Sequence, residues 1–172
     1  MNINFMSFNL KIKLSITRYH FLQTLFAGIT ITLIILLGET FSNNVINAAI
    51  GSSVALVFLH PGNKQNRFRS LFGGNIVAII TFLFLHFLFL SFNQDLFITI
   101  YQRDFHIFSG LSFTLCILIM SITDTEHIPA AGTSIGLSVN NIDYTLILFI
   151  LFSILFLYAL KVNINKYGKN LF

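Results

Sequence analysis

The sequence predicts an all-α fold, a polytopic membrane helix bundle in which six apolar segments form two inverted three-helix repeats. Of the 172 residues, 55% are hydrophobic and only 9% are charged, whereas a soluble domain carries about 25% charged residues. A chain with so few charges cannot cover itself with a solvated surface. We therefore expect a single integral membrane domain over residues 1–172, in contact with the lipid bilayer.

Four of the six apolar segments are long, and the middle segment of each repeat is short. The first follows basic residues, as in a signal peptide, but its apolar stretch is too long for one and predicts an uncleaved transmembrane helix. A spanning helix needs about 20 residues. The second and fifth segments cover only about 22 Å and 18 Å as helices, so we expect them to be short or broken. In chain order the segments are 19–38, 45–59, 71–92, 107–122, 128–139 and 144–160.

Lysine and arginine indicate how the chain crosses the membrane. With six crossings and cytoplasmic termini, every basic residue except Arg103 lies on the cytoplasmic side, as the positive-inside rule requires. The rule therefore favours six crossings. We expect the membrane to be a bacterial inner membrane. A re-entrant fifth segment remains the alternative. The net charge of +4 lies in loops and termini, so we interpret it as membrane orientation and expect no nucleic-acid partner.

The two short segments resemble each other. Ala48–Ser53 is similar to Ala130–Ser134, and each follows a long apolar segment that ends in acidic residues. With three crossings per repeat, about 19–92 and 105–160, the second repeat enters from the opposite side. In such proteins the substrate lies near the midplane, between the short helices. We expect their N-terminal ends to meet at a shared cavity, where unpaired N–H groups favour an anion. Alternatively, small residues only let the helices pack closely.

The short segments supply the candidate substrate-binding residues. Hydroxyl groups could replace the water around an anion, or could bond to their own helix carbonyls. Glycines could let the backbone approach a ligand, or let two helices cross closely. The histidine could bond the substrate or carry a proton, or could cap the short helix. The residues are Gly51, Ser52, Ser53, His127, Pro129, Gly132, Thr133 and Ser134.

Charged and ionisable residues form two further groups. Gating or proton coupling could involve three acids and one intramembrane histidine; alternatively, the acids mark helix ends and the histidine bonds to a neighbouring helix. Three basic residues could concentrate anions at the cytoplasmic mouth, or only set the topology and meet anionic lipid. The first group is Glu39, His86, Asp124 and Glu126, and the second is Lys64, Arg67 and Arg69.

No arrangement of residues in the sequence suggests catalysis. There is no plausible Ser/His/Asp set, no metal-ligand spacing and no phosphate-binding glycine loop. Glu126 and His127 are adjacent and do not share a helix face, so we expect no metal there. The single Cys116 lies in an apolar run and can form no internal disulfide. We expect neither an enzyme nor a cofactor.

The fifth segment resembles the signature of the HPP family of integral membrane proteins, named for a His-Pro-Pro motif followed by small residues. The motif reads His127-Ile128-Pro129-Ala130-Ala131-Gly132-Thr133, with Ile128 in place of the middle proline. The resemblance includes Gly51–Phe58 and the stretch from Arg69 to Asn75, where the family more often has histidine at the last position. It extends over roughly residues 20–160.

Some members of that family, in cyanobacteria and plastids, are associated with nitrite uptake. The resemblance therefore implies a nitrite-like small inorganic anion as substrate, carried by a transporter or channel. A homo-oligomer would shield the short helices from lipid. Two alternatives stay open: a proton or cation channel, and a non-transporting membrane scaffold or assembly subunit.

Overall fold

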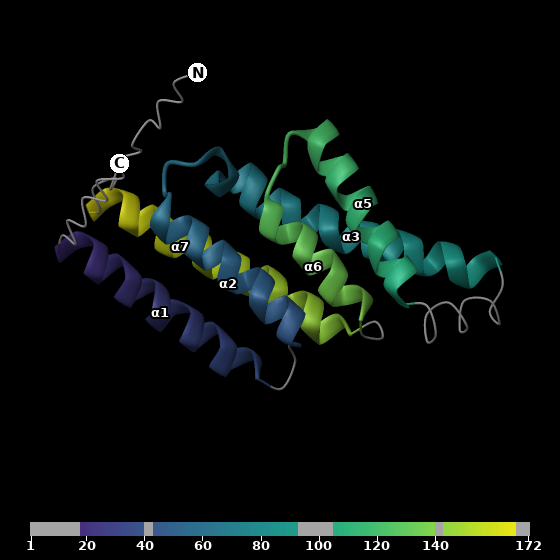
Figure 1. Cartoon of the computed structure of the whole chain (residues 1–172), viewed down its shortest axis with the longest axis horizontal. Coiled ribbons are helices and arrows are strands. Elements are labelled where there is room, and N and C mark those ends of the chain that lie inside the picture. Colours follow the sequence, from purple (N-terminus) through teal and green to yellow (C-terminus); the bar gives the residue numbers. More distant parts are fainter. Residues whose placement is uncertain (1–17, 40–42, 93–104, 140–142, 168–172) are drawn as a thin grey trace, which may run out of the picture.

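The computed structural model describes residues 18–39, 43–92, 105–139 and 143–167, and this part of the chain is helical throughout apart from short connections (Figure 1). The prediction of an all-α bundle is confirmed. In order, the elements are α1 (Arg18–Gly38), α2 (Asn44–Leu59), the 3₁₀ turn η1 (Lys64–Asn66), α3 (Phe68–Phe92), α5 (Phe105–Thr123), α6 (Ile128–Ser138) and α7 (Tyr144–Tyr167).

Helices α1, α3, α5 and α7 are long and apolar enough to cross a membrane, while α2 is a shorter apolar helix. Their large apolar side chains point outward at many positions, including Phe21, Ile122 and Leu148, as a lipid-facing surface requires. The long helices exceed the expected segments slightly: α3 begins at Phe68 and α7 continues to Tyr167. These observations make the chain an integral membrane protein.

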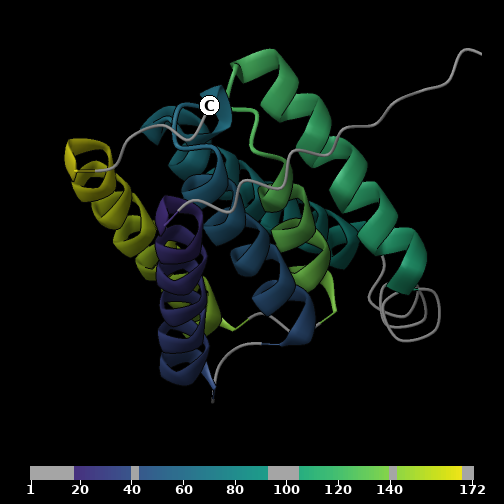
Figure 2. The same ribbon diagram turned by 60° about the vertical axis from the view of Figure 1, so that its left-hand side comes forward.

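Successive helices run in opposite directions, so α1 begins and α7 ends at the same end of the bundle (Figure 1). We call this the basic end, because Lys64, Arg67, Arg69 and Lys161 lie there. In Figure 2, α2 and α6 occupy the middle, with α1 on one side and α5 on the other. Since α2 and α6 are antiparallel, the second repeat runs opposite to the first, as expected of an inverted repeat.

Side-chain caps determine where α2 begins and ends. The Asn43 side chain accepts a hydrogen bond from the backbone N–H of Ile46 at 2.8 Å, which satisfies one of the free donors in the first turn. At the other end, the Asn66 amide donates to the carbonyls of Leu56, at 2.8 Å, and His60, at 2.7 Å. The connection to α3 is therefore held against the end of α2.

Helix α5 ends in a left-handed turn. Asp124 has a φ of 52°, a conformation that aspartate tolerates better than most residues, and the N–H of Thr125 donates to the Met120 carbonyl at 3.0 Å. This six-to-one bond is typical of a Schellman C-cap. The turn sends the chain back into the bundle at His127, which precedes α6.

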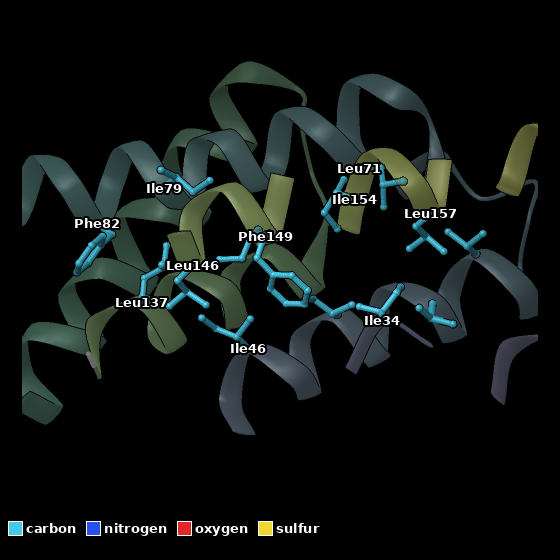
Figure 3. Packing of buried hydrophobic residues seen from close by; sticks show 14 of the residues in the cluster. Ile34, Ile46, Leu71, Ile79, Phe82, Leu137, Leu146, Phe149, Ile154 and Leu157 are labelled. Atoms are coloured by element: carbon cyan, nitrogen blue, oxygen red, sulfur yellow. The ribbon is translucent and has the colours of Figure 1, made fainter. Parts of the chain in front are cut away.

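The described residues form two core clusters of different composition. The larger consists of aliphatic and aromatic side chains from all six described helices, including Ile34, Phe82 and Ile154 (Figure 3). The smaller lies between α3, α5 and α6 and consists mainly of small residues, including Ala78, Cys116 and Ala130, with Met120 and Ala131. Short side chains of this kind let neighbouring helices pack closely.

The expected meeting of the two helix N-termini is wrong. Asn43, at the start of α2, donates through its amide to the carbonyl of Gly136 near the end of α6, at 2.9 Å. The start of α6 lies instead beside Gln65, beyond the end of α2. The two short helices therefore pack side by side along their length. Small residues on the facing sides of the two helices allow this close contact.

Glycines in α6 allow this side-by-side contact. A Cβ added at Gly132 would lie 3.3 Å from that of Ala49, and one at Gly136 would lie 2.5 Å from the Ile46 side chain and 3.1 Å from its backbone nitrogen. Both glycines thus serve close helix crossing, the alternative that the sequence left open.

Candidate functional site

A fully buried histidine joins the two repeats. The Nδ1 atom of His127 lies 3.0 Å from the carbonyl oxygen of Gln65, and Nε2 lies 2.9 Å from the hydroxyl of Ser53 on α2. A carbonyl can only accept a hydrogen bond, so Nδ1 carries the hydrogen. In the neutral ring, Nε2 then accepts from Ser53. The His127 side chain makes no capping bond to α6, which removes the proposed capping role.

A second buried polar pair connects α6 with α3. The Thr133 hydroxyl donates to the side-chain oxygen of Asn75 at 3.1 Å, while the Asn75 amide donates to the Leu71 carbonyl at 2.8 Å. Both side chains are almost completely buried. Thr133 therefore faces the neighbouring helix and not its own carbonyls.

Small and hydroxyl-bearing side chains follow one another between α3, α5 and α6. Cys116 on α5 lies beside Ser134 on α6, whose hydroxyl donates to the Ala131 carbonyl at 2.8 Å, and Ala78 of α3 belongs to the same cluster as Cys116. One turn farther from the basic end, Ser112 and Ser138 follow on the same helix faces, and both are buried. We call these five residues the small-residue seam.

One buried hydroxyl of the seam lacks a hydrogen-bond partner among the described residues. Among the described residues, the Ser112 hydroxyl oxygen is buried and has no hydrogen-bond partner. A buried polar atom without a partner costs about 1–3 kcal/mol. The hydroxyls of Ser109 and Ser153 are in the same state among the described residues, but Ser112 alone of the three lies in the seam.

Aromatic side chains fill the far end of the seam. Phe82 of α3 and Phe108 of α5 are fully buried, with ring centroids 6.3 Å apart in an edge-to-face arrangement. Phe89 packs on Phe108 at 5.8 Å, and His86 lies beside Phe82 at 5.8 Å. On α5, Phe108 of this aromatic cluster lies one helical turn beyond Ser112, farther from the basic end.

At the basic end, a polar hollow of about 160 Å³ lies over the connections between helices. We call it the vestibule. Arg69 donates to the Thr123 carbonyl at 2.6 Å and lies 3.8 Å from the Asp124 carboxylate, and both charged side chains are exposed. Its lining is Lys64, Gln65, Arg67, Arg69, Ser70, Asp124 and Glu126.

A second hollow, of about 210 Å³, lies between α5 and α6 and is mainly apolar. Its lining includes His127, and it shares Gln65 and Glu126 with the vestibule. It also includes Met120 and Ala131, which pack in the same cluster as the seam residues. We call it the histidine hollow. Vestibule, histidine hollow and seam are therefore neighbours in that order.

The structure brings together only some of the predicted substrate-binding residues. Ser53, His127, Thr133 and Ser134 are buried at the contacts of α6 with α2, α3 and α5. Pro129 lies in the first turn of α6.

Two predicted binding residues face elsewhere. The Ser52 hydroxyl is exposed and donates to the Ala48 carbonyl of its own helix at 2.8 Å. A Cβ on Gly51 would meet Ile31 of α1 at 3.7 Å. Neither residue faces α6, because consecutive positions on a helix point about 100° apart.

The charged candidates separate by location. Lys64, Arg67 and Arg69 share the vestibule with Asp124 and Glu126. Glu39 is exposed just after α1, at the opposite end of the bundle. His86 lies within α3 at the aromatic cluster, away from the other candidates.

Three residues that sequence reasoning did not select belong to the site. The backbone carbonyl of Gln65 pairs with His127, and its side chain accepts from the Ile128 N–H at 3.3 Å. Asn75 accepts from Thr133, and Ser112 lies in the seam. Lys161, which the sequence counts only among the cytoplasmic basic residues, lies outside the linings of both hollows. It is buried, donates to the Asn66 backbone carbonyl and lies 5.8 Å from the Tyr158 ring centroid.

Six described helices of alternating direction, four of them long and apolar enough to span a membrane, define a polytopic helical membrane protein. The family model described as HPP, transmembrane region, matches residues 13–170. The chain therefore belongs to that family, as its motif suggested. No curated protein and no solved structure matches the chain.

Proposed function

We propose that this protein carries a small, nitrite-like inorganic anion across the membrane, through the vestibule, the histidine hollow and the small-residue seam. One observation supports it above all: the two hollows share Gln65 and Glu126, and the second shares Met120 and Ala131 with the cluster of small residues between α3, α5 and α6. A polar mouth thus continues into the part of the bundle with the smallest side chains.

The chemistry of this route favours an anion over a cation. Three basic side chains, Lys64, Arg67 and Arg69, outnumber the two acids in the vestibule lining and raise the local concentration of anions. In the seam, the hydroxyls of Ser134 and Ser138 donate to carbonyls of their own helix. An anion that loses its hydration needs hydrogen-bond donors, and the Ser112 hydroxyl, which has no partner among the described residues, can supply one.

The aromatic cluster is the proposed gate. Phe82 and Phe108 lie beyond Ser112 and are fully buried, so these rings close the proposed route on the side away from the basic end. Passage requires these rings to rotate or α3 and α5 to shift. Such alternation between two openings around one site is usual for inverted repeats.

Orientation and assembly complete the proposal. The positive-inside rule places the basic end in the cytoplasm, in a bacterial inner membrane, with the vestibule open to the cell interior. Helix α6 has 11 residues, which as a helix covers only about 16 Å. A homo-oligomer would cover the side of the histidine hollow where Ile117 and Ile128 are exposed.

The test is nitrite flux into liposomes that contain the purified protein. Ser112→Ala removes one donor from the seam, and losing a hydrogen bond to a charged group costs about 1.5–3 kcal/mol, so flux should fall about tenfold or more. Thr114→Ala is the matched control, since Thr114 is exposed on the same helix and bonds to its own Gly110 carbonyl at 2.8 Å.

Flux of cations in place of anions would establish the channel alternative. Absence of flux for every small ion would favour a scaffold. Equal flux in Ser112→Ala and Thr114→Ala would show that the anion does not pass through the seam.

A further inference from the structure

The hydrogen atoms around His127 can be arranged in two complete ways. Ser53 lies within bonding distance of two acceptors, Nε2 of His127 at 2.9 Å and the Ala49 carbonyl of its own helix at 3.2 Å. The serine has a single hydroxyl hydrogen. It can therefore serve only one of these acceptors at a time, and the protonation state of the ring decides which.

With neutral His127, the Ser53 hydrogen points to Nε2, and the Ala49 carbonyl keeps only its helical bond. With a protonated ring, Nε2 donates to the Ser53 oxygen, and the Ser53 hydrogen turns to Ala49. Nδ1 donates to the Gln65 carbonyl at 3.0 Å in both states. Each state has every ring hydrogen bonded, so the site accepts one proton by rotating one hydroxyl.

We propose that His127 takes up one proton together with each anion that enters the histidine hollow, while the Ser53 hydroxyl rotates to accept a hydrogen bond from the protonated ring. This inference rests on the proposed function and adds its coupling ion. His127 is fully buried, and a buried unpaired charge is strongly unfavourable. An anion in the adjoining hollow, which His127 lines, supplies the missing opposite charge. Proton and anion therefore bind in a mutually dependent manner.

Few other ionisable groups face this site. Glu126, before α6, lines the same hollow and is exposed, so it can attract the proton from the vestibule. The described part of α2 carries no charged residue, and α5 contributes Cys116 in the seam.

The remaining charged groups lie in the vestibule. They are Lys64, Arg67 and Arg69 from the α2–α3 side and Asp124 from the end of α5. None of them contacts the His127 ring in a described hydrogen bond. The proton site is therefore the imidazole itself, and the hydroxyl beside it is a positioning group.

The test uses liposomes with the membrane potential clamped at zero and a pH gradient of about one unit, alkaline inside. One proton per anion predicts about tenfold accumulation of nitrite, because one pH unit is a tenfold difference in proton activity. Nitrous acid crossing the lipid approaches the same ratio, so accumulation is compared as an initial rate, with protein-free liposomes as the background. His127→Gln keeps a donor and an acceptor but cannot ionise, and should carry nitrite with no accumulation above this background. His106→Gln is the control, because the His106 side chain is exposed on α5 and lies outside the linings of both hollows.

A measurement on the unaltered protein guards against variants that fold poorly. The protein is labelled with ¹⁵N-histidine and placed in lipid nanodiscs, and the Nε2 signal of His127 is identified by its loss in His127→Gln. Nitrite should shift this signal toward the imidazolium position. Ser53→Ala should weaken that shift, because the protonated ring then lacks its acceptor.

The outcomes separate the two proposals. No nitrite flux in any protein would overturn the proposed function. Rapid exchange of labelled nitrite, with net accumulation no faster than in protein-free liposomes, would leave that function standing and overturn the proton coupling. Accumulation that persists in His127→Gln, or a nitrogen signal that nitrite leaves unchanged, would place the proton elsewhere and overturn the role of His127.

Discussion

Replacing Gly74 by alanine tests the packing that holds His127 in place. A Cβ at this position of α3 would lie 2.9 Å from both the Thr125 carbonyl oxygen and the His127 Cβ, and 3.3 Å from the Met120 sulfur. Comfortable carbon contacts are about 3.5–4.0 Å. Two of the three neighbours belong to, or lie next to, the backbone, so the α5–α6 connection must move away.

Two opposing effects set the size of the change. Alanine is better than glycine in a helix interior by about 1 kcal/mol, while forcing a methyl into filled space costs about 1–3 kcal/mol. Gly28→Ala and Gly110→Ala isolate the first effect, because a Cβ at either position meets nothing within 4 Å. Gly74→Ala should be less stable than these controls by about 2 kcal/mol, the middle of the packing range.

Thermal unfolding in detergent measures the difference. For a chain of this size, about 2 kcal/mol corresponds to a melting temperature about 4–8 °C lower. The displaced loop should also draw His127 away from Ser53, so nitrite flux should fall in Gly74→Ala and persist in both controls. A Gly74→Ala protein that melts at or above the controls would show that the α5–α6 connection does not rest on α3.

Three further predictions concern the mouth, the gate and the α7 contact. Removing charge from the vestibule with Lys64→Gln and Arg67→Gln should slow nitrite flux at low salt. The difference in flux from the unaltered protein should shrink as the Debye length falls to about 10 Å at 0.1 M salt, which flux measured over a salt series checks. Phe108→Leu should raise flux because a smaller side chain leaves the seam less tightly closed, and unchanged or lower flux would argue against this gate. Lys161→Met should lower stability by about 1–2 kcal/mol, since the Asn66 carbonyl loses its donor, and thermal unfolding would contradict this if it showed no change.

Hydropathy and charge were enough to predict the helices and their alternating directions. The segment bounds follow from where apolar runs stop, at Gly38, Leu59 and Thr123 for example. Basic residues gathered in loops predicted that α1 begins and α7 ends at one end of the bundle, and Figure 1 shows this arrangement. These features depend on local composition, which a single sequence displays directly.

The contact between the short helices could not be predicted in the same way. A brief similarity between Ala48–Ser53 and Ala130–Ser134 shows that two helices are related, but it does not show which faces meet. Ser52 and Ser53 are adjacent, yet only Ser53 reaches His127. Helix rotation is set by the packing of distant side chains, and it decides which hydroxyl is buried.

The seam was missed for a related reason. Ser112 and Cys116 are single small residues in an apolar helix, where they are common and uninformative. Their significance depends on Ala78 and Ser134 lying opposite them, which requires three helices to be placed at once. Small residues from separate segments acquire a role only when they face the same interior.

Accessibility of Cys116 during nitrite transport tests the central claim most directly. It is the single cysteine of the chain and lies buried within the seam, so no other thiol needs to be removed. A small anionic methanethiosulfonate reagent applied at the basic end should label it and block nitrite flux, excess nitrite should slow the labelling, and Cys116→Ala should be insensitive. Full labelling with unchanged flux, or labelling that nitrite does not slow, would show that the anion does not pass between α3, α5 and α6.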